Sequence, residues 1–277
     1  MVVIAPSSIC ALIAARNERP YLQVLLPRLA AQGIDVAILD HGSSDGSHAL
    51  YEQLRGAPVV AVEPLADTGV FSLSAQLIAK QQLAACLPHR WLVHHDADEL
   101  LHHRDGRSSL RQCIEEAEGE GANALNFEEF VFLPEPGSEQ PSANHLEQHR
   151  LYYYFLKGEN RLNRAFRREL NGCNAASGGH VLGGEGVQLA RTTHVLRHYI
   201  ALSEAHIQVK YATRRFCPEE LAAGWHRKRL AIPPEQLRIP ARSPYLFTLP
   251  AADHPELNRS CPAREHYWLW SAGERQP

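Results

Sequence analysis

Two aspartates separated by one residue are the most chemically informative feature of the sequence. Asp96 and Asp98, with Glu99 beside them, follow the run Trp-Leu-Val-His-His at residues 91–95. A mainly apolar run of this length predicts a buried strand, so the carboxylates come at a strand end. Carboxylate oxygens suit Mg²⁺ and Mn²⁺, and such an ion in turn binds diphosphate groups. A solvated acidic turn is the plain alternative, and the strand before the motif favours a binding site.

A second polar loop, at residues 40–47, also follows a predicted strand. Asp40 ends that strand and could accept hydrogen bonds from a base or a ribose, while Gly42 and Gly46 permit tight turns. Asp45 is expected to cap the next helix, and the serines are typical of an ordinary strand–helix turn. No Gly-Lys-Ser/Thr sequence follows, so this loop is not a P-loop.

Polar residues follow the first and third predicted strands as well. Arg16, Asn17 and Glu18 come directly after the first strand, and Asp67 comes after the third. Ligands of open α/β sheets bind at the carboxyl ends of the strands. We therefore expect these side chains to share one cleft with the two polar loops.

The elements that position these residues alternate along the first half of the chain, as is typical of a parallel α/β sheet. Strands are predicted at residues 9–15, 34–39, 58–62, 91–95 and 122–127, and helices at 20–31, 46–54, 71–87 and 108–118. The second half is expected to add strands at 151–156 and 192–200, helices at 203–215 and 218–229, an exposed loop at 133–149 and a mobile loop at 171–186.

Composition narrows the class of protein. Of the 277 residues, 44% are hydrophobic and 21% are charged, and the net charge of −3 gives no basic footprint for nucleic acid. The scattered cysteines fit a reducing compartment, and no apolar stretch approaches the roughly 20 residues of a membrane helix. No basic residue precedes the apolar start, so a signal peptide is not expected. Lys and Arg clusters after Lys157 and at residues 214–229 could meet phosphate, an anionic acceptor or a membrane surface.

Three ordered motifs resemble those of a known family. They are Ile-Ala-Ala-Arg-Asn-Glu, Leu-Asp-His-Gly-Ser-Ser-Asp-Gly-Ser and Trp-Leu-Val-His-His-Asp-Ala-Asp-Glu-Leu-Leu. Together they look like the family 2 type of glycosyltransferase with a GT-A fold, in the bacterial branch whose D-x-D-E closes a strand. The resemblance covers residues 8–103, and His180, His198-Tyr199, Ser203 and Lys210 are similar to the branch's C-terminal pattern H…HY…S…K.

This resemblance implies a fold and a division of the chain. The fold is α/β, with a GT-A-like (Rossmann-like), mostly parallel sheet flanked by helices and a mixed C-terminal extension. Residues 1–130 would bind the nucleotide-sugar. Residues 131–277 would form the acceptor side, in one compact unit with the first half.

The resemblance also implies an activity, which is inverting transfer of a sugar from a UDP- or GDP-sugar to a hydroxyl group, with Mn²⁺ or Mg²⁺. The acceptor would be a saccharide of a cell-surface polymer or a glycolipid. The location would be cytoplasmic, with peripheral contact at the inner face of the membrane. The implied nucleotide-binding residues are Arg16, Asn17, Glu18, Asp40, Gly42, Asp67 and Asp96. The implied metal ligands are Asp96 and Asp98 with a histidine of the second half, for which His180, His194 and His198 are candidates.

Inverting transfer needs a carboxylate that takes the proton of the acceptor hydroxyl. Glu128 and Glu129, after the fifth predicted strand, and Glu185, in a Gly-rich loop, are the candidates. The family's usual base motif is not evident, and His41 stands where an aspartate or asparagine is more usual.

Two alternatives stay open. One is a pseudoenzyme of the same fold that binds a nucleotide-sugar or carbohydrate without turnover. The other is a nucleotidyltransferase, which normally has a Gly-rich basic loop after its first strand. This chain has only two arginines there, which makes the second alternative the weaker one.

Overall fold

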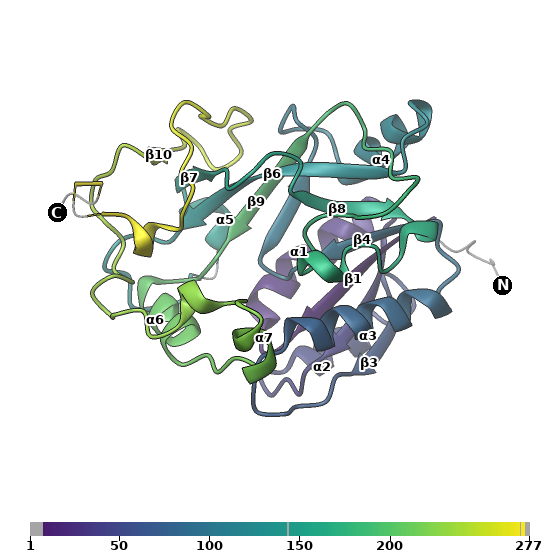
Figure 1. The fold of residues 1–277 in the computed structure, drawn as a ribbon, viewed down its shortest axis with the longest axis horizontal. Coiled ribbons are helices and arrows are strands. Elements are labelled where there is room, and N and C mark those ends of the chain that lie inside the picture. Colours follow the sequence, from purple (N-terminus) through teal and green to yellow (C-terminus); the bar gives the residue numbers. More distant parts are fainter. Residues whose placement is uncertain (1–7, 143, 272, 275–277) are drawn as a thin grey trace.

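Four parallel strands form the N-terminal part of the central sheet in the computed structural model, which describes residues 8–142, 144–271 and 273–274 (Figure 1). They are β1 (Ile9–Ala15), β2 (Asp35–Asp40), β3 (Val59–Pro64) and β4 (Trp91–His95), in the spatial order β3-β2-β1-β4. β1 is apolar along its whole length because both of its faces are covered, as is usual for parallel strands. All four strands end at one edge, so the loops that follow them come together.

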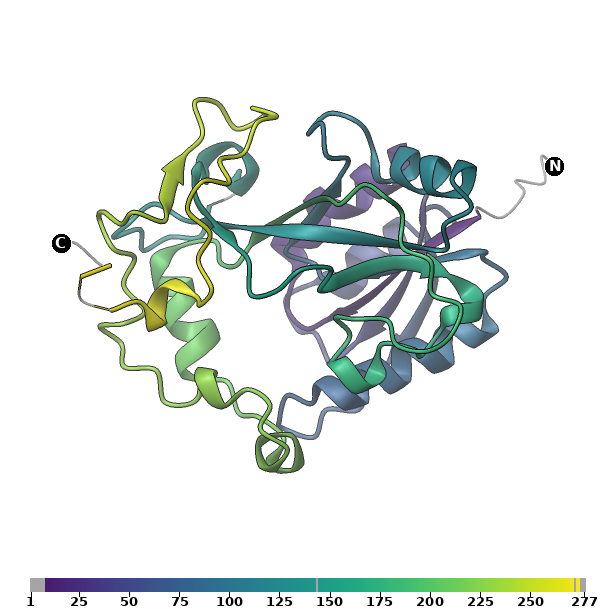
Figure 2. The same cartoon turned by 45° about the horizontal axis from the view of Figure 1, so that its top comes forward.

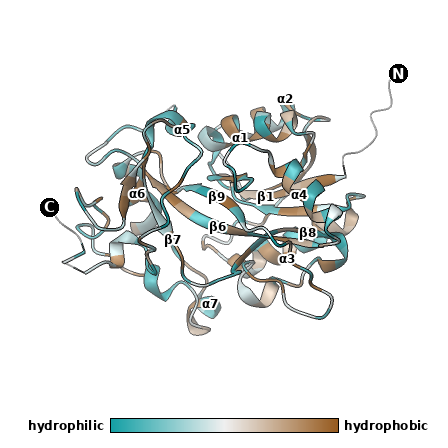
Figure 3. Cartoon of the chain, turned by 90° about the horizontal axis from the view of Figure 1, so that it is seen from above, coloured by the Kyte–Doolittle hydropathy of each residue, from teal (hydrophilic) through white to brown (hydrophobic). Residues whose placement is uncertain are grey.

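Helices cover both faces of these strands (Figure 3). The odd-numbered residues of β1 share one hydrophobic core with α1 (Arg19–Ala31), and its even-numbered residues share another with α3 (Leu73–Cys86). This division follows from the alternation of side chains along a strand. α2 (Ser47–Gln53) lies beside α1.

Local sequence signals set the helix boundaries. Pro20 lies in the first turn of α1, and Gly33 adopts a left-handed conformation just past its end, with φ of 62°. α3 begins after Ser72, whose side chain accepts a hydrogen bond from the amide of Ala75. α4 (Leu110–Gly119) begins with a capping box formed by Ser109 and Gln112.

The chain after β4 extends the sheet with strands that are mostly antiparallel to their neighbours. They are β5 (Glu99–His102), β6 (Ala124–Leu133), β7 (Leu151–Phe155), β8 (Leu162–Arg167), β9 (His194–Tyr199) and β10 (Leu246–Thr248). β8 lies between β4 and β6 and is antiparallel to both, while β9 is parallel to β6 and antiparallel to β5. β7 and β10 continue the sheet beyond β6. The long strand β6 therefore runs from the parallel strands into the C-terminal part (Figure 2).

Short helices and long connections complete the C-terminal part. They are α5 (His145–Gln148), α6 (Glu204–Ala212), α7 (Pro218–Ala222) and the 3₁₀ turns Arg168–Leu170, Ala175–Ser177, Arg227–Arg229 and Tyr267–Leu269. Tyr153, Tyr211, Trp268 and Trp270 belong to a separate buried core here, so these aromatic side chains serve packing. Among the helices that the structure describes, none combines the length and apolar character needed to cross a membrane.

The expected fold class is confirmed, since helices flank both faces of a central sheet whose strands β1 to β4 are parallel. The strand expected at 122–127 extends to Leu133 because its last residues pair with β7 and β9. The helix expected at 218–229 ends at Ala222, and His226 beyond it has a φ of 59°, which no α-helix allows. The sequence pattern does not predict β5, β8 and β10, whose partners lie far along the chain.

Candidate active site

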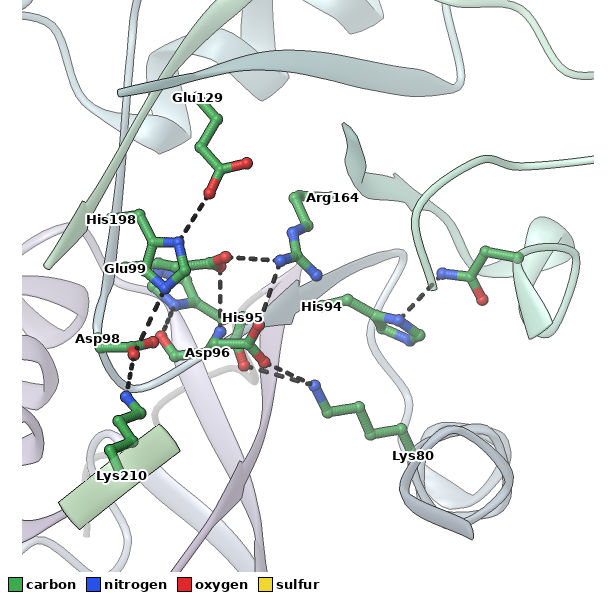
Figure 4. A network of polar contacts seen from close by, with 11 residues as sticks. Lys80, His94, His95, Asp96, Asp98, Glu99, Glu129, Arg164, His198 and Lys210 are labelled. Atoms are coloured by element: carbon green, nitrogen blue, oxygen red, sulfur yellow. Dashed lines mark hydrogen bonds and ion pairs between the residues drawn. The ribbon is translucent and has the colours of Figure 1, made fainter. Parts of the chain in front are cut away.

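A cleft of about 1060 Å³ opens at the carboxyl ends of β1, β2 and β4 and extends past β6, β9, α3 and α6. Among the residues singled out from the sequence, those that line it are Arg16, Glu18, His41, Asp96, Asp98, Glu99, Glu129, His180, His198 and Lys210. Those that do not line it are Asn17, Asp40, Gly42, Asp67, Glu128, Glu185 and His194. Figure 4 shows the polar network on which the rest of the site is built.

Asp96 stands at the end of β4 between two cationic side chains. Its Oδ2 lies 3.1 Å from Nη2 of Arg164, and its Oδ1 lies 3.7 Å from Nζ of Lys80 (Figure 4). Partial burial would raise the pKa of this carboxyl, but Arg164 and Lys80 more than offset that effect and lower the pKa well below its usual range. Asp96 is therefore ionised at neutral pH, and 46% of its side chain remains exposed in the cleft.

Glu99 shares Arg164 with Asp96. The same Nη2 atom lies 2.5 Å from Oε1 of Glu99, and Oε2 of Glu99 accepts a hydrogen bond of 3.2 Å from the Asp96 amide. Burial raises the pKa of Glu99 to about 7, against the opposing charge of Arg164. Glu99 thus fixes the turn that carries Asp96, and its own protonation is finely balanced near neutral pH.

A chain of charged groups links Asp98 to β6. Asp98 Oδ2 lies 2.7 Å from Nζ of Lys210 and 3.4 Å from Nε2 of His198, and Nδ1 of His198 lies 2.7 Å from Oε1 of Glu129 (Figure 4). Burial lowers the pKa of His198, but Asp98 and Glu129 outweigh it and raise that pKa well above 6.5. Nδ1 of His198 is thus hydrogen-bonded to Glu129, and its Nε2 lies within ion-pair distance of Asp98.

The side chains expected to hold a divalent ion do not fit one as they lie. Among the described residues, no three His, Cys, Asp or Glu side chains are grouped as a metal would require. Asp96 and Asp98 are already paired with Lys80, Arg164 and Lys210. Both ring nitrogens of His198 already face carboxylates, those of Glu129 and Asp98. His180 lines the cleft as a neutral imidazole, because burial lowers its pKa to about 3, but it forms no group with the other expected ligands.

The loops after β1 and β3 are joined by an ion pair. Arg16 Nη1 and Nη2 lie 3.1 and 2.9 Å from the two carboxylate oxygens of Asp67, which also accepts a hydrogen bond of 2.9 Å from the Gly69 amide. Arg16 lines the cleft, whereas Asp67 lies behind it. Asp67 is thus placed to orient Arg16 toward a ligand.

The loops after β1 and β2 are joined through Asn17. The backbone amide of Asn17 donates a 3.0 Å hydrogen bond to Oγ of Ser43. Its side-chain Oδ1 accepts one of 2.7 Å from the backbone amide of Ser44. Asn17 adopts a left-handed conformation with φ of 56°, which asparagine tolerates better than most residues. Its side chain therefore acts on the loop, not on the cleft.

Asp40 is placed differently from the contact with a base that the resemblance implies. Only 3% of it is exposed, and it accepts hydrogen bonds from the Ser43 amide at 2.8 Å and the Tyr51 hydroxyl at 3.1 Å. A third contact comes from His48, whose Nε2 lies 3.2 Å from Oδ1 of Asp40. These partners show that the carboxylate braces the loop after β2. Gly42 follows in a left-handed conformation with φ of 70°, so the turn favours glycine there.

Glu18 lies at the cleft end that Lys210 and Asp98 share. Burial raises its pKa to about 7, Lys210 acts in the lowering direction and Asp98 acts in the raising direction. A carboxyl with this pKa can hold or release a proton near neutral pH, or it can accept hydrogen bonds from a bound hydroxyl group.

The three candidate bases lie in three different settings. Glu129 lines the cleft, and although burial acts to raise its pKa, His198 lowers it to about 2. Glu128 is the next residue on β6 and points to the opposite face of the strand, where Nε of Arg259 binds it at 2.9 Å. Glu185 is exposed and lies outside the cleft. Of the three, only Glu129 is placed to meet a substrate bound with Asp98.

Sequence reasoning missed two cations of the network. Lys80 is 5% exposed and is the only charged residue of α3, and a single lysine in so apolar a helix was a usable signal. Arg164 lies on β8, a strand that the pattern does not predict, and its sequence neighbours gave no sign of its partners.

No protein-family model matches the chain, and no curated protein matches it. Similar solved structures include S. aureus TarS 1–349 in complex with UDP, with 12% identity over 73% of this chain and a TM-score of 0.39. The structure of TarS 1–349 without UDP has 12% identity over 74% of this chain and a TM-score of 0.41. A Desulfovibrio desulfuricans G20 protein described as a nucleotide-diphospho-sugar transferase gives 11% identity over 80% of this chain and 91% of its own, with a TM-score of 0.37. The chain spans 63% of TarS 1–349.

Proposed function

We propose that this protein is an inverting glycosyltransferase that transfers a sugar from a UDP- or GDP-sugar to a hydroxyl acceptor. One observation carries the proposal. Residues that follow three different strands, Arg16, His41 and Asp98, line a single cleft with Glu129 on its other side. A cleft of about 1060 Å³ has room for a nucleotide-sugar and part of an acceptor.

The nucleoside would bind against the loops after β1, β2 and β3. Asp67 orients Arg16, and Asp40 and Asn17 hold the backbone of the loop that carries His41. Such prior bracing lowers the entropic cost of binding, because the loops need not become ordered when the donor arrives.

The diphosphate would lie toward the cations of the network. Lys210 and Arg214 both line the cleft, and Lys210 keeps its place through its contact with Asp98. As the bond between the anomeric carbon and the phosphate oxygen breaks, negative charge grows on the nucleoside diphosphate. Fixed positive charges aimed at that oxygen stabilise the transition state most.

Glu129 would act as the general base. It takes the proton from the acceptor hydroxyl while that oxygen forms a bond to the anomeric carbon, and the nucleoside diphosphate leaves with the bonding electrons. Its carboxylate is ionised at neutral pH, and His198 holds it in place.

A divalent ion, Mn²⁺ or Mg²⁺, stays a prediction of the family resemblance and enters none of these steps. Its expected ligands are Asp96, Asp98, His180 and His198. An ion on Asp98 would have to displace Lys210 and break the contact between Asp98 and His198. Release of nucleoside diphosphate, measured with EDTA and again after Mn²⁺ is restored, tests the requirement.

The proposal is tested by incubating the protein with UDP- and GDP-sugars and measuring free UDP or GDP. Asp98→Asn is expected to abolish the release, and Asp253→Asn, an exposed aspartate outside the cleft, is the matched control. Donor binding is followed in parallel by thermal unfolding, since a ligand that binds the native state raises its stability.

The outcomes separate the alternatives. A shift with UDP or GDP but no release with any donor and acceptor would indicate a binding protein. Pyrophosphate release from a nucleoside triphosphate and a sugar 1-phosphate would indicate a nucleotidyltransferase. A shift with NAD alone would refute the nucleotide-sugar assignment.

A further inference from the structure

One wall of the cleft carries cations that the donor does not account for. Lys157, Arg161 and Arg229 all line the cleft and come from two separate segments. Lys157 and Arg161 lie on the connection between β7 and β8, and Arg229 ends a 3₁₀ turn beyond α7. The fold therefore brings Arg229 to the two cations of this connection.

These cations lack acidic partners. In residues 8–142, 144–271 and 273–274, no carboxylate lies within ion-pair distance of Lys157, Arg161 or Arg229. The neighbouring Arg164 and Lys228 differ, because Arg164 is paired with Asp96 and Glu99, and Lys228 with Glu265. Burial, and next the charge of Arg161, lower the pKa of Lys157, as expected where positive charges crowd together.

The register of the sheet places this cation cluster beside Glu129. Phe155, the last residue of β7, pairs with Glu129, and Lys157 follows it by two residues. Leu162, the first residue of β8, pairs with Phe127, and Arg161 precedes it. The cations are thus neighbours of the carboxylate that we assign as the base.

The same register separates the cluster from the nucleotide loops. In the sheet order β7-β6-β8-β4-β1-β2-β3, Lys157 and Arg161 lie on the connection between β7 and β8, whereas Arg16 and His41 follow β1 and β2. A donor whose nucleoside lies over β1 and β2 would direct its diphosphate at Lys210 and Asp98. Its sugar would then lie between that point and the cations.

We infer that the acceptor carries a phosphate group, which Lys157, Arg161 and Arg229 bind while Glu129 meets the hydroxyl of the same molecule. The inference rests on the proposed function and names the substrate class on its acceptor side. Arginine binds phosphate through paired N–H donors, and unpaired cations in a cleft gain most from such a ligand. Aromatic rings flank the cluster, since His266 stacks on Phe155 with ring centroids 4.3 Å apart, and they offer a surface for a sugar or polyol.

Binding is measured by isothermal titration, which requires no turnover. The probes are glucose 6-phosphate against glucose, glycerol 3-phosphate against glycerol, and phosphatidylglycerol vesicles against phosphatidylcholine vesicles. We expect each phosphate ester to bind at least about tenfold more tightly than its unphosphorylated counterpart, and the anionic vesicles more tightly than the zwitterionic ones. The soluble probes and the vesicles distinguish a free phosphate ester from a lipid headgroup.

The variants are Arg161→Gln with Arg229→Gln, and the matched control is Arg104→Gln with Arg242→Gln, two exposed arginines outside the cleft. The first pair is expected to lose about tenfold or more of the preference for phosphate, and the control to keep it. Arg161→Lys with Arg229→Lys retains both charges and should retain most of the binding. Thermal unfolding of each variant shows that it is folded.

Two results would overturn the inference. One is equal binding of phosphorylated and neutral probes by the unmodified protein. The other is a loss of UDP affinity in the Arg161→Gln, Arg229→Gln variant as large as its loss of probe affinity, because the cations would then serve the donor. Failure of the proposed function is distinct, since it shows as absence of UDP and GDP binding and of their release.

Discussion

The two walls of the cleft handle charge in opposite ways. On the donor side, Arg16 is paired with Asp67, and Asp40 is bound by Ser43 and Tyr51. On the acceptor side, Lys157 and Arg161 have no acidic partner within the described part of the chain. A wall whose polar groups satisfy one another is already shaped for its ligand, whereas a wall of unpaired cations is completed only by an anion. If the proposed function is right, the loops after β1 and β2 are preorganised for the nucleoside, and the unpaired cations select an anionic acceptor.

The largest expected effect comes from Glu129, which stands between the walls. Glu129→Gln removes the proposed base but keeps its shape, so we expect transfer to fall by about 10²–10⁴-fold. Affinity for UDP should change little, because the donor wall is untouched. Steady-state transfer rates and titration with UDP measure the two quantities separately.

Glu128→Gln is the control for that variant, since Glu128 is the adjacent residue on the opposite face of β6. Its transfer rate should stay near that of the unmodified protein. Equal losses in the two variants would point to damage of β6 and would leave Glu129 without a chemical role.

Lys210→Met is expected to have the next largest effect, because it leaves Asp98 without its closest cation at 2.7 Å. Breaking a buried ion pair from one side costs about 3–5 kcal/mol of stability. Urea unfolding at pH 7 measures the loss, and UDP titration should show weaker donor binding. Unchanged UDP affinity in a folded variant would show that the diphosphate lies elsewhere.

Glu220 tests the contact between α7 and the start of α3, two elements that meet beside the cleft. This buried residue of α7 accepts hydrogen bonds from Oγ and the amide of Ser74, both at 2.6 Å, and from the Leu73 amide at 3.1 Å, at the start of α3. Burial acts to raise its pKa, but the hydrogen bonds outweigh it and lower the pKa to about 2, from 4.5. The folded state therefore gains stability above pH 4.5 and loses it as the pH falls toward 2.

Glu220→Gln should cost about 1.5–3 kcal/mol at pH 7, the range for hydrogen bonds to a charged group. It should also weaken the dependence of stability on pH between about 4.5 and 2. Urea unfolding across that range measures both effects. Glu219→Gln, at the exposed neighbouring position, should leave the stability at pH 7 nearly unchanged.

The smallest expected effect concerns the donor wall itself. Arg16→Gln removes an ion pair whose members are 47% and 41% exposed, so stability should change by only about 0–1 kcal/mol. UDP should nevertheless bind about tenfold more weakly, which corresponds to roughly 1.4 kcal/mol. Arg55→Gln breaks a similarly exposed pair with Glu52 outside the cleft, so its UDP affinity should be unchanged.

The sequence pattern predicted those parts of the site in which a polar loop directly follows a buried strand. The turn at Asp96 and Asp98 and the loop at Arg16 each follow a buried strand directly, so their place at one sheet edge could be predicted from local features. Lys80 and Arg164 could not be predicted in the same way. Their roles depend on the approach of α3 and on the antiparallel insertion of β8 between β4 and β6. Such pairings are decided by packing between segments, which no short window of sequence contains.

The polar side chains of the second loop illustrate a different limit. Asp40 and Asn17 were expected to touch the nucleotide, and the structure gives both of them partners within the loops. A strand end identifies where a ligand binds, but it does not say whether a carboxylate faces the ligand or the backbone. Here Asp40 accepts a hydrogen bond from Tyr51, a residue of the following helix, which the loop sequence alone does not reveal.

A short parallel β-bridge joins Phe71, just before α3, to Phe216, just before α7, and it affects how this protein could be engineered. The Phe71 amide donates to the carbonyl of Arg215 at 2.7 Å, and the Cys217 amide donates to the carbonyl of Phe71 at 2.9 Å. A segment far downstream thus finishes the entrance to α3. A gene fragment that stops after β6 would encode the loops after β1, β2 and β3 without these hydrogen bonds. We therefore expect that the first half of the chain cannot simply be transferred into another protein as an independent domain.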